Sequence, residues 1–168
     1  MWTKFNVVFK SFFIIIAMSI VSVVVVGSST NTNYANEDLN KVVNPVSVDA
    51  FMKYMMNEDW DVVVDPAKKD LVDGYANANL NGMEIEFYKY ESVNDARIKF
   101  IDNNEDLLSN ISGSYAIRSF TWKNGERITV GNDGRYILLS RVDDTMIFLN
   151  VKSDYKSDVV EIIKDIGY

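Results

Sequence analysis

The chain has 168 residues, 17 of them basic and 24 acidic, and it contains neither cysteine nor histidine. Without cysteine it forms no disulfide and offers no thiolate to a substrate or to zinc. Without histidine it lacks the usual general base near neutral pH and the commonest metal ligand. We expect a single domain with no cofactor and no metal centre.

Charge is distributed unevenly along the chain. The first 27 residues contain only two charged side chains, Lys4 and Lys10, so the remainder carries 15 basic and 24 acidic residues, a net charge of −9. An acidic surface repels nucleic acid and anionic lipid. We therefore expect no nucleic-acid partner.

Residues 1–27 have the pattern of a membrane-targeting segment. Lys4 and Lys10 precede a largely apolar run, residues 12–26, which small residues follow. This order is typical of a secretory signal peptide, with cleavage points at Gly27 or Ser29. If Lys10 extends its amino group to the lipid surface, the apolar segment also approaches the ~20 residues that a transmembrane helix needs.

Both alternatives place the domain outside the cell membrane, because the lysines lie on the leader side of the apolar run. The chain is predicted either to keep a single N-terminal span or to be secreted after cleavage near Gly27 and Ser29. Residues 28–45 are polar and aperiodic and predict a linker, followed by an extracytoplasmic domain over residues 46–168. The N-terminal segment is then the only expected contact with the membrane.

The predicted domain opens with a helix over residues 48–57, for which Ser47 is a suitable N-cap. Its apolar face consists of Val48, Phe51, Met52 and Met55. Residues 60–64 predict a strand. Asp65 and Pro66 then suit the start of a short helix that stops at Gly74.

Asn81-Gly82 predicts a two-residue hairpin loop, and such a loop fixes the register of its two strands. On the apolar face, Leu80 faces Met83, Ala78 faces Ile85 and Ala76 faces Phe87. On the other face, Asn79 faces Glu84, Asn77 faces Glu86 and Tyr75 faces Tyr88.

Ser92 and Asp95 resemble a capping box at the start of a second helix that runs to about Leu108. Its apolar stripe consists of Val93, Ala96, Phe100, Leu107 and Leu108. Four further strands are predicted, with turns at Asn124-Gly125, Asp133-Gly134 and Asp143-Asp144. In that register Glu126 faces Lys123 on one side and Arg141 on the other. One face of these strands collects Ile128, Val130, Ile137, Leu139, Met146 and Phe148.

An amphipathic helix over residues 154–166 ends the pattern. Its apolar stripe consists of Tyr155, Val159, Ile162, Ile163 and Ile166. The predicted order is α-β-(short α)-β-β-α-β-β-β-β-α. This order indicates the α+β class, an antiparallel sheet of hairpins with amphipathic helices packed on it.

The end of the chain resembles the ending of small exported proteins of low-GC Gram-positive bacteria. The resemblance lies in residues 140–148, in Tyr155-Lys-Ser-Asp158 and in Ile166-Gly-Tyr168. The opening helix after Ser47 and the strand at residues 84–88 fit the same pattern. The resemblance covers most of residues 47–168 and implies export and an α+β fold, without an assigned activity. Those proteins often carry a lipoprotein cysteine, which this chain lacks, so lipid anchoring is not implied.

Glu84 and Glu86 lie on one strand face beside Tyr88 and Tyr90. Paired carboxylates can perform acid–base hydrolysis, as in glycosidases. Strand alternation alone also places them together on a solvated face. Arg141, near Glu126 and the acids of the last turn, has a comparable structural explanation as a cross-strand ion pair.

The second face of the last four strands is also apolar. It collects Phe120, Trp122, Tyr136, Leu138, Ile147, Leu149 and Val151. A sheet that is apolar on both faces needs cover on both. Helices and the first hairpin can supply that cover, or the face can form a concave binding surface.

The sequence thus favours a non-catalytic extracytoplasmic binding or interaction module of a bacterial cell envelope, acting on an unknown protein or small ligand outside the membrane. The weak binding-surface candidates are Phe120, Trp122, Tyr136, Leu138 and Arg141. The alternatives are a carboxylate-based hydrolase that uses Glu84 and Glu86, and a structural component of the envelope. No catalytic, cofactor-binding or metal residue is assigned.

Overall fold

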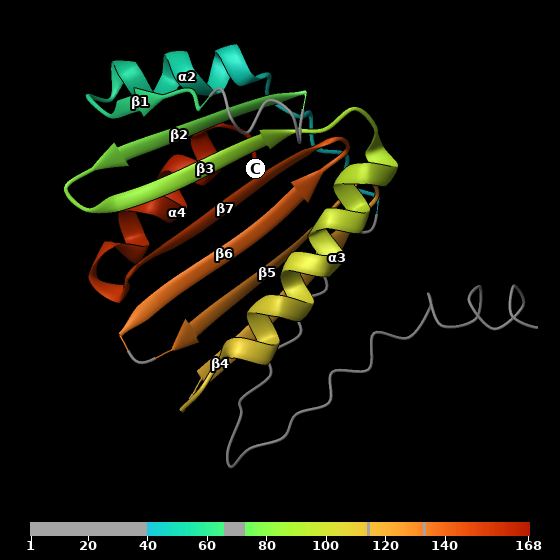
Figure 1. The fold of residues 1–168 in the computed structure, drawn as a ribbon, viewed down its shortest axis with the longest axis vertical. Helices are drawn as coiled ribbons and strands as arrows, with labels where there is room; N and C mark the ends of the chain where they lie inside the picture. The colour runs from blue at the N-terminus through green and yellow to red at the C-terminus, as the bar shows by residue number, and fades with distance from the viewer. Residues whose placement is uncertain (1–39, 66–72, 114, 133) are drawn as a thin grey trace, which may run out of the picture. The chain divides into compact units, whose positions relative to one another are not determined.

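The computed structural model describes residues 40–65, 73–113, 115–132 and 134–168 (Figure 1). The chain divides into two units, residues 1–30 and 31–168, and every described residue belongs to the second. The predicted membrane segment and most of the predicted linker lie outside the described residues. No helix in the described part of the chain is long and apolar enough to cross a membrane.

The described chain forms a seven-stranded antiparallel sheet with helices on both faces, so the predicted α+β class is confirmed. The strand order across the sheet is β1-β2-β3-β7-β6-β5-β4. The elements are α2 (Val48–Asn57), β1 (Asp61–Val63), β2 (Gly74–Leu80), β3 (Met83–Lys89), α3 (Val93–Asn110), β4 (Tyr115–Trp122), β5 (Gly125–Asn132), β6 (Arg135–Val142), β7 (Thr145–Lys152), η2 (Ser153–Tyr155) and α4 (Lys156–Asp165). The short helix predicted after Asp65 lies outside the described residues.

Both serines predicted as N-caps have that role in the structure. The Ser47 hydroxyl accepts a hydrogen bond from the backbone N–H of Ala50 at 3.1 Å, and the Ser92 hydroxyl accepts one from Asp95 at 3.1 Å. Each serine therefore satisfies an N–H that the first helical turn leaves without a partner.

The predicted β2–β3 register is also confirmed, with Ala78 opposite Ile85 and Asn77 opposite Glu86. Asn81 and Gly82 have φ values of 52° and 79°. Positive φ at both central residues gives a turn whose twist matches that of the flanking strands. Local turn chemistry alone thus determines this pairing.

The β4–β5 turn lies one residue earlier than predicted, which shifts the pairing of its strands by two residues. Trp122 pairs with Gly125, so the loop is Lys123-Asn124 rather than Asn124-Gly125, and Glu126 faces Thr121 instead of Lys123. The reason is that Gly125 serves packing rather than the turn: an added Cβ there would lie 2.3 Å from Trp122 Nε1 and 2.5 Å from the Arg141 carbonyl oxygen. A shift of two residues preserves which face each side chain occupies.

Two hydrophobic clusters lie on opposite faces of the sheet. In Figure 1, α3 crosses in front of the sheet and α4 lies behind it. The α3 side buries Ala96, Phe100, Ile128, Val130, Leu139 and Met146. The other side joins α2 and α4 to the sheet through Phe51, Met55, Ile85, Phe87, Leu149, Val159 and Ile163. Val93 and Leu108, predicted for the apolar stripe of α3, are instead 50% and 39% exposed, because only part of that helix rests on the sheet.

The chain packs against the domain before the predicted boundary at residue 46. Val43 is only 7% exposed and belongs to the cluster shared by α2 and α4. Its backbone N–H donates to Asn124 Oδ1 at 3.0 Å, and Asn124 Nδ2 donates to its carbonyl at 2.6 Å. The Lys123 N–H also donates to the Lys41 carbonyl at 3.2 Å. Residues 41–45, predicted as linker, are therefore held at the β4–β5 turn; we call them the entry segment.

Two glycines of β5 provide a matched test of this packing. Gly125→Ala should destabilise the domain by about 1–3 kcal/mol, because the added methyl group collides with a backbone oxygen and the Trp122 indole. Gly131→Ala meets no atom within 4 Å and should change stability by less than about 1 kcal/mol, in the stabilising direction. Urea unfolding followed by tryptophan fluorescence measures both. Equal effects of the two substitutions would contradict the close packing of Trp122 on Gly125.

Candidate ligand-binding site

The face of the sheet that carries α4 is only partly covered, and the open part lies over β4 and β5. Three cross-strand rows form its floor. They are Ala116–Gly131–Tyr136, Arg118–Thr129–Leu138 and Phe120–Arg127–Ser140. The first row contains two small residues, and no atom lies within 4 Å of where a Gly131 side chain would begin. The floor is therefore hollowed at that end.

One edge of α4 forms the wall of this hollow. Lys156, Val160 and Lys164 follow one another at four-residue spacing, which places them on one side of a helix. The Lys156 ammonium lies 5.3 Å from the centre of the Tyr136 ring, within the range of a cation–π contact. Val160 is 41% exposed although it is apolar.

Two adjacent cavities, of about 280 and 450 Å³, lie between this edge of α4 and the strands, and Arg127 and Val160 border both. We refer to them together as the α4 groove. Five basic side chains line it: Lys41, Arg118, Arg127, Lys156 and Lys164. Arg135 borders the larger cavity as well, but its side chain lies on the α3 face of the sheet, where it donates to Asn150. None of the described residues that line either cavity is acidic. In a chain with net charge −7, this groove is a local region of the opposite sign.

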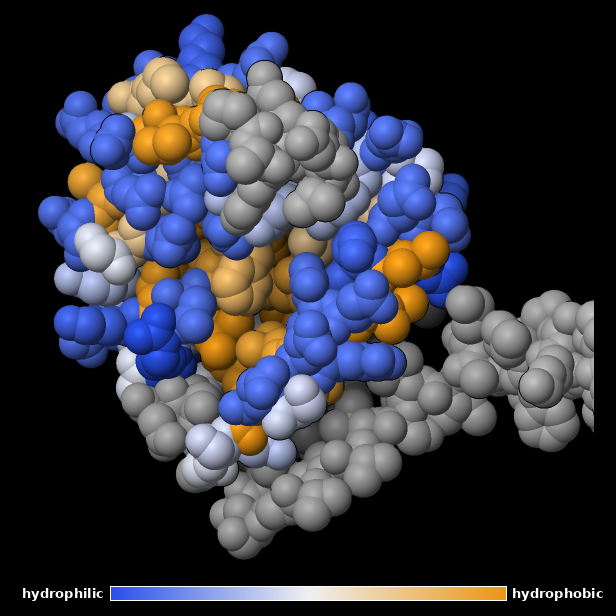
Figure 2. Space-filling view, in the orientation of Figure 1, coloured by the Kyte–Doolittle hydropathy of each residue, from blue (hydrophilic) through white to orange (hydrophobic). Residues whose placement is uncertain are grey.

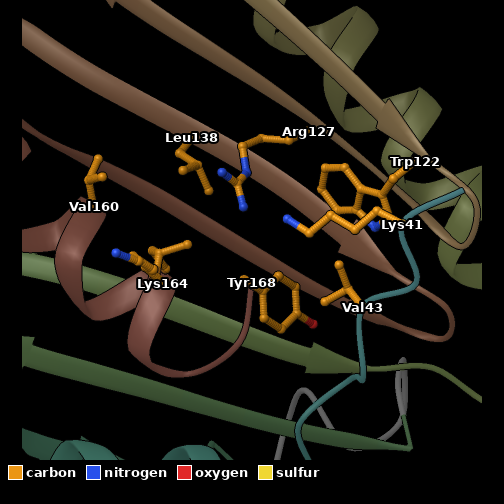
Figure 3. Close-up of a pocket in the computed structure, with 9 residues that line it drawn as sticks. Lys41, Val43, Trp122, Arg127, Leu138, Val160, Lys164 and Tyr168 are labelled. Carbon is orange, nitrogen blue, oxygen red and sulfur yellow. The ribbon is translucent and has the colours of Figure 1, made fainter. Parts of the chain in front are cut away.

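The smaller cavity lies between the entry segment and the sheet (Figure 3). Lys41 reaches into it from the entry segment and Arg127 from β5, and Figure 3 shows their nitrogen-bearing ends pointing toward one another. The Arg127 guanidinium carbon lies 5.6 Å from the centre of the Trp122 ring, and its Nε donates to the Ser140 hydroxyl at 3.4 Å. Two cations that share a cavity repel each other, so an anion between them lowers the electrostatic energy.

The aromatic residues of the groove contribute apolar surface and no negative charge. Burial raises the pKa of the Tyr136 phenol, against an opposing effect of Arg127 and Arg118. Burial likewise raises the pKa of Tyr168, whose hydroxyl is hydrogen-bonded to Thr145. Both phenols therefore stay neutral at physiological pH.

Trp122 is only 4% exposed, and its Nε1 has no hydrogen-bond partner in the described chain. Because that edge of the indole rests on Gly125, the nitrogen is closed off from the groove. Trp122 therefore contributes a rigid apolar wall rather than a hydrogen-bond donor to a ligand.

The structure brings together four of the five side chains proposed from the sequence. Phe120, Trp122, Tyr136 and Leu138 all border the groove. Arg141 lies on the opposite face of the sheet, where its Nε is 2.8 Å from Glu126 Oε1 and its Nη1 donates to the Asp143 carbonyl at 2.9 Å. The predicted cross-strand ion pair is thus confirmed, and Arg141 does not contribute to the groove.

The basic residues of the groove were not identified from the sequence. Two signals were available: Lys156 and Lys164 lie eight residues apart on the terminal helix, and Arg118 alternates in phase with Phe120 and Trp122. Either signal places basic side chains beside the apolar face. Lys41 carried no such signal, since it lies in an aperiodic segment.

Glu84 and Glu86 do not share a cleft among the described residues. Glu84 is exposed, whereas Glu86 is half-buried and accepts hydrogen bonds from the Tyr75 and Tyr88 hydroxyls at 3.0 and 2.7 Å. Glu86 borders a cavity on the α3 side that Glu84 does not line. This geometry lends no support to a hydrolase that uses the two glutamates together.

No family model, no curated protein and no solved structure matches this chain. Within the described residues, no group of three or more acidic side chains is placed to hold a metal ion. The functional argument therefore rests on the geometry and charge of the α4 groove.

Asn124→Ala should release the entry segment. The substitution removes both hydrogen bonds to Val43, each of which stabilises by about 1 kcal/mol. Trypsin should then cleave after Lys41 about tenfold faster, as local opening becomes more frequent. Asn94→Ala, at an exposed position on α3, is the control. Equal cleavage rates in the two variants, measured by mass spectrometry, would show that Asn124 does not hold the segment.

Proposed function

We propose that this domain is a non-catalytic, extracytoplasmic binding module whose α4 groove takes a small anionic ligand with an apolar part. The single observation that supports this most strongly is the charge of the groove. Five basic side chains and no acidic one line it, although acids outnumber bases in the chain by 24 to 17. A random surface of this composition would carry more acidic than basic side chains.

The apolar surface in the groove favours a ligand with an apolar part over a free inorganic ion. Phe120 and Leu138 lie on its floor, and Val160 is exposed on its wall. Small-molecule sites combine an apolar lining with a few polar groups that orient the ligand. An aromatic or aliphatic body with one phosphate, sulfate or carboxylate group fits both features.

The chemistry available in the groove supports binding rather than catalysis. The chain contains no cysteine and no histidine, and the two phenols bordering the groove remain protonated. The groove therefore offers permanent positive charge and apolar contact, which recognise a ligand but do not transfer protons near neutral pH.

A location outside the membrane is supported by the order of the leader. Two lysines precede the apolar run of residues 12–26, which favours a domain on the far side of the membrane. This order of residues supports two fates of the leader. It is either retained as a single span or removed by cleavage near Gly27 and Ser29, which releases the domain. The resemblance to small exported proteins agrees with either fate.

The binding proposal is tested with 1-naphthyl phosphate and its cationic counterpart, 1-naphthylmethylamine, by isothermal titration calorimetry on the full chain. The phosphate should bind one per chain, more weakly as salt increases, and the amine should not bind. Lys156→Gln and Lys164→Gln should each weaken phosphate binding roughly three- to tenfold.

Lys99→Gln is the matched control, because Lys99 lies exposed on α3 and its only described ion pair, to Asp102, is a long one of 3.8 Å. Its affinity for the phosphate should equal that of the unmodified chain. Equal binding of the phosphate and the amine, or unchanged affinity in both α4 variants, would refute the anionic ligand.

A further inference from the structure

The helix α3 rests on the sheet through an apolar stripe that polar residues flank in its second half. Ala96 and Phe100 are 0% and 6% exposed, and Leu107 and Ile111 continue the stripe, partly buried against the same cluster. Beside them, Asn103, Asp106 and Asn110 are polar and line a cavity of about 500 Å³.

The floor of this cavity is apolar and comes from three strands. Tyr88 lies on β3, Ile137 on β6 and Phe148 on β7. Figure 2 shows the hollow beside α3, with hydrophobic residues at its bottom and hydrophilic residues along the helix. The volume lies within the roughly 300–1,000 Å³ typical of small-ligand sites.

One acceptor at the rim is held in a fixed position. The two carboxylate oxygens of Glu86 accept hydrogen bonds from the Tyr75 and Tyr88 hydroxyls at 3.0 and 2.7 Å. Burial, together with the carboxylate of Glu86, raises the pKa of Tyr88 far above its usual value, so this phenol remains a donor. An oriented carboxylate of this kind is preorganised to accept further hydrogen bonds from a ligand.

The amides of the cavity are suited to ligand contact rather than to holding the fold. Among the described residues, the Asn103 side-chain nitrogen donates to the Met146 sulfur at 3.9 Å, a weak acceptor. The Asn110 amide donates to the Asp106 carbonyl of its own helix at 2.8 Å, so it does not link α3 to the sheet. Each amide group offers both a donor and an acceptor.

We propose that this cavity is a second ligand site, separate from the α4 groove, and that it takes a neutral polyhydroxyl compound of the saccharide class. Hydroxyl groups donate and accept hydrogen bonds as the lining amides and Glu86 do. The C–H face of a sugar ring packs against aromatic rings such as Tyr88 and Phe148. The lining carries two acids, Glu86 and Asp106, and one base, Arg135, which donates to the Asn150 side chain and carbonyl. Its net negative charge disfavours an anion.

The experiment titrates the full chain with maltotriose, cellotriose and chitotriose by calorimetry and records melting temperatures of the variants. At least one trisaccharide should bind one per chain. Asn103→Leu and Asn110→Leu should each weaken that binding roughly tenfold. Neither should lower the melting temperature, because leucine favours the helix and fills apolar space. Lys164→Gln should leave saccharide binding unchanged, which separates this site from the groove.

Three outcomes would overturn the saccharide site. The first is that none of the three trisaccharides binds at about ten millimolar, above the millimolar affinities of weak small-ligand sites. The second is binding that neither leucine substitution weakens. The third is a lower melting temperature in both leucine variants, which would show that the amides hold α3 in place. Failure here leaves the naphthyl phosphate result in the groove unaffected.

Discussion

The architecture depends on one constraint, which is that the central strands are apolar on both faces and must be covered on both. Seven strands about 4.8 Å apart make a sheet roughly 29 Å wide. A helix is about 10 Å across, so α2 and α4 together cover about 20 Å of one face. The remaining width corresponds to about two strands. Those strands are β4 and β5, and the α4 groove lies over them.

The opposite face meets the same constraint differently. The strands β2 and β3 turn polar residues to that side, among them Asn77 and Glu84, so they need no cover. A single helix, α3, covers the strands β6 and β7 beside them. In its second half Leu107 still packs against the sheet, but the polar residues Asn103, Asp106 and Asn110 flank it. Each face thus has a cavity at the border between covered and uncovered strands.

Much of the fold was predictable because short-range chemistry determines it. Two-residue turns set the hairpin registers, serines marked the helix starts, and alternation assigned side chains to faces. The predicted position of the β4–β5 turn was wrong, because Asn124-Gly125 is also a sequence typical of a two-residue hairpin loop. Here the glycine leaves space for Trp122, and the asparagine amide holds Val43. Both roles depend on contacts between distant segments, which a local pattern does not contain.

The candidate site was predictable in part for the same reason. Alternation placed Phe120, Trp122, Tyr136 and Leu138 on one face, and the structure keeps them there. Which part of that face stays open depends on where α4 lies, and no spacing in the sequence specifies this. Arg141 was a candidate because it lies near Glu126 and the acids of the last turn, but strand alternation puts that ion pair on the other face.

The attachment of the entry segment has a mechanical consequence. Any tension applied to the chain before Lys41 reaches the fold at the Lys41 carbonyl, which Lys123 holds, and then at Val43, which Asn124 holds, before it reaches α2. These contacts follow one another along the chain, so such a pull loads them in turn. Because Lys41 forms part of the groove wall, the first element to detach also carries away one of its cations. The positive charge of the groove therefore depends on the tension in the polypeptide that leads into Lys41.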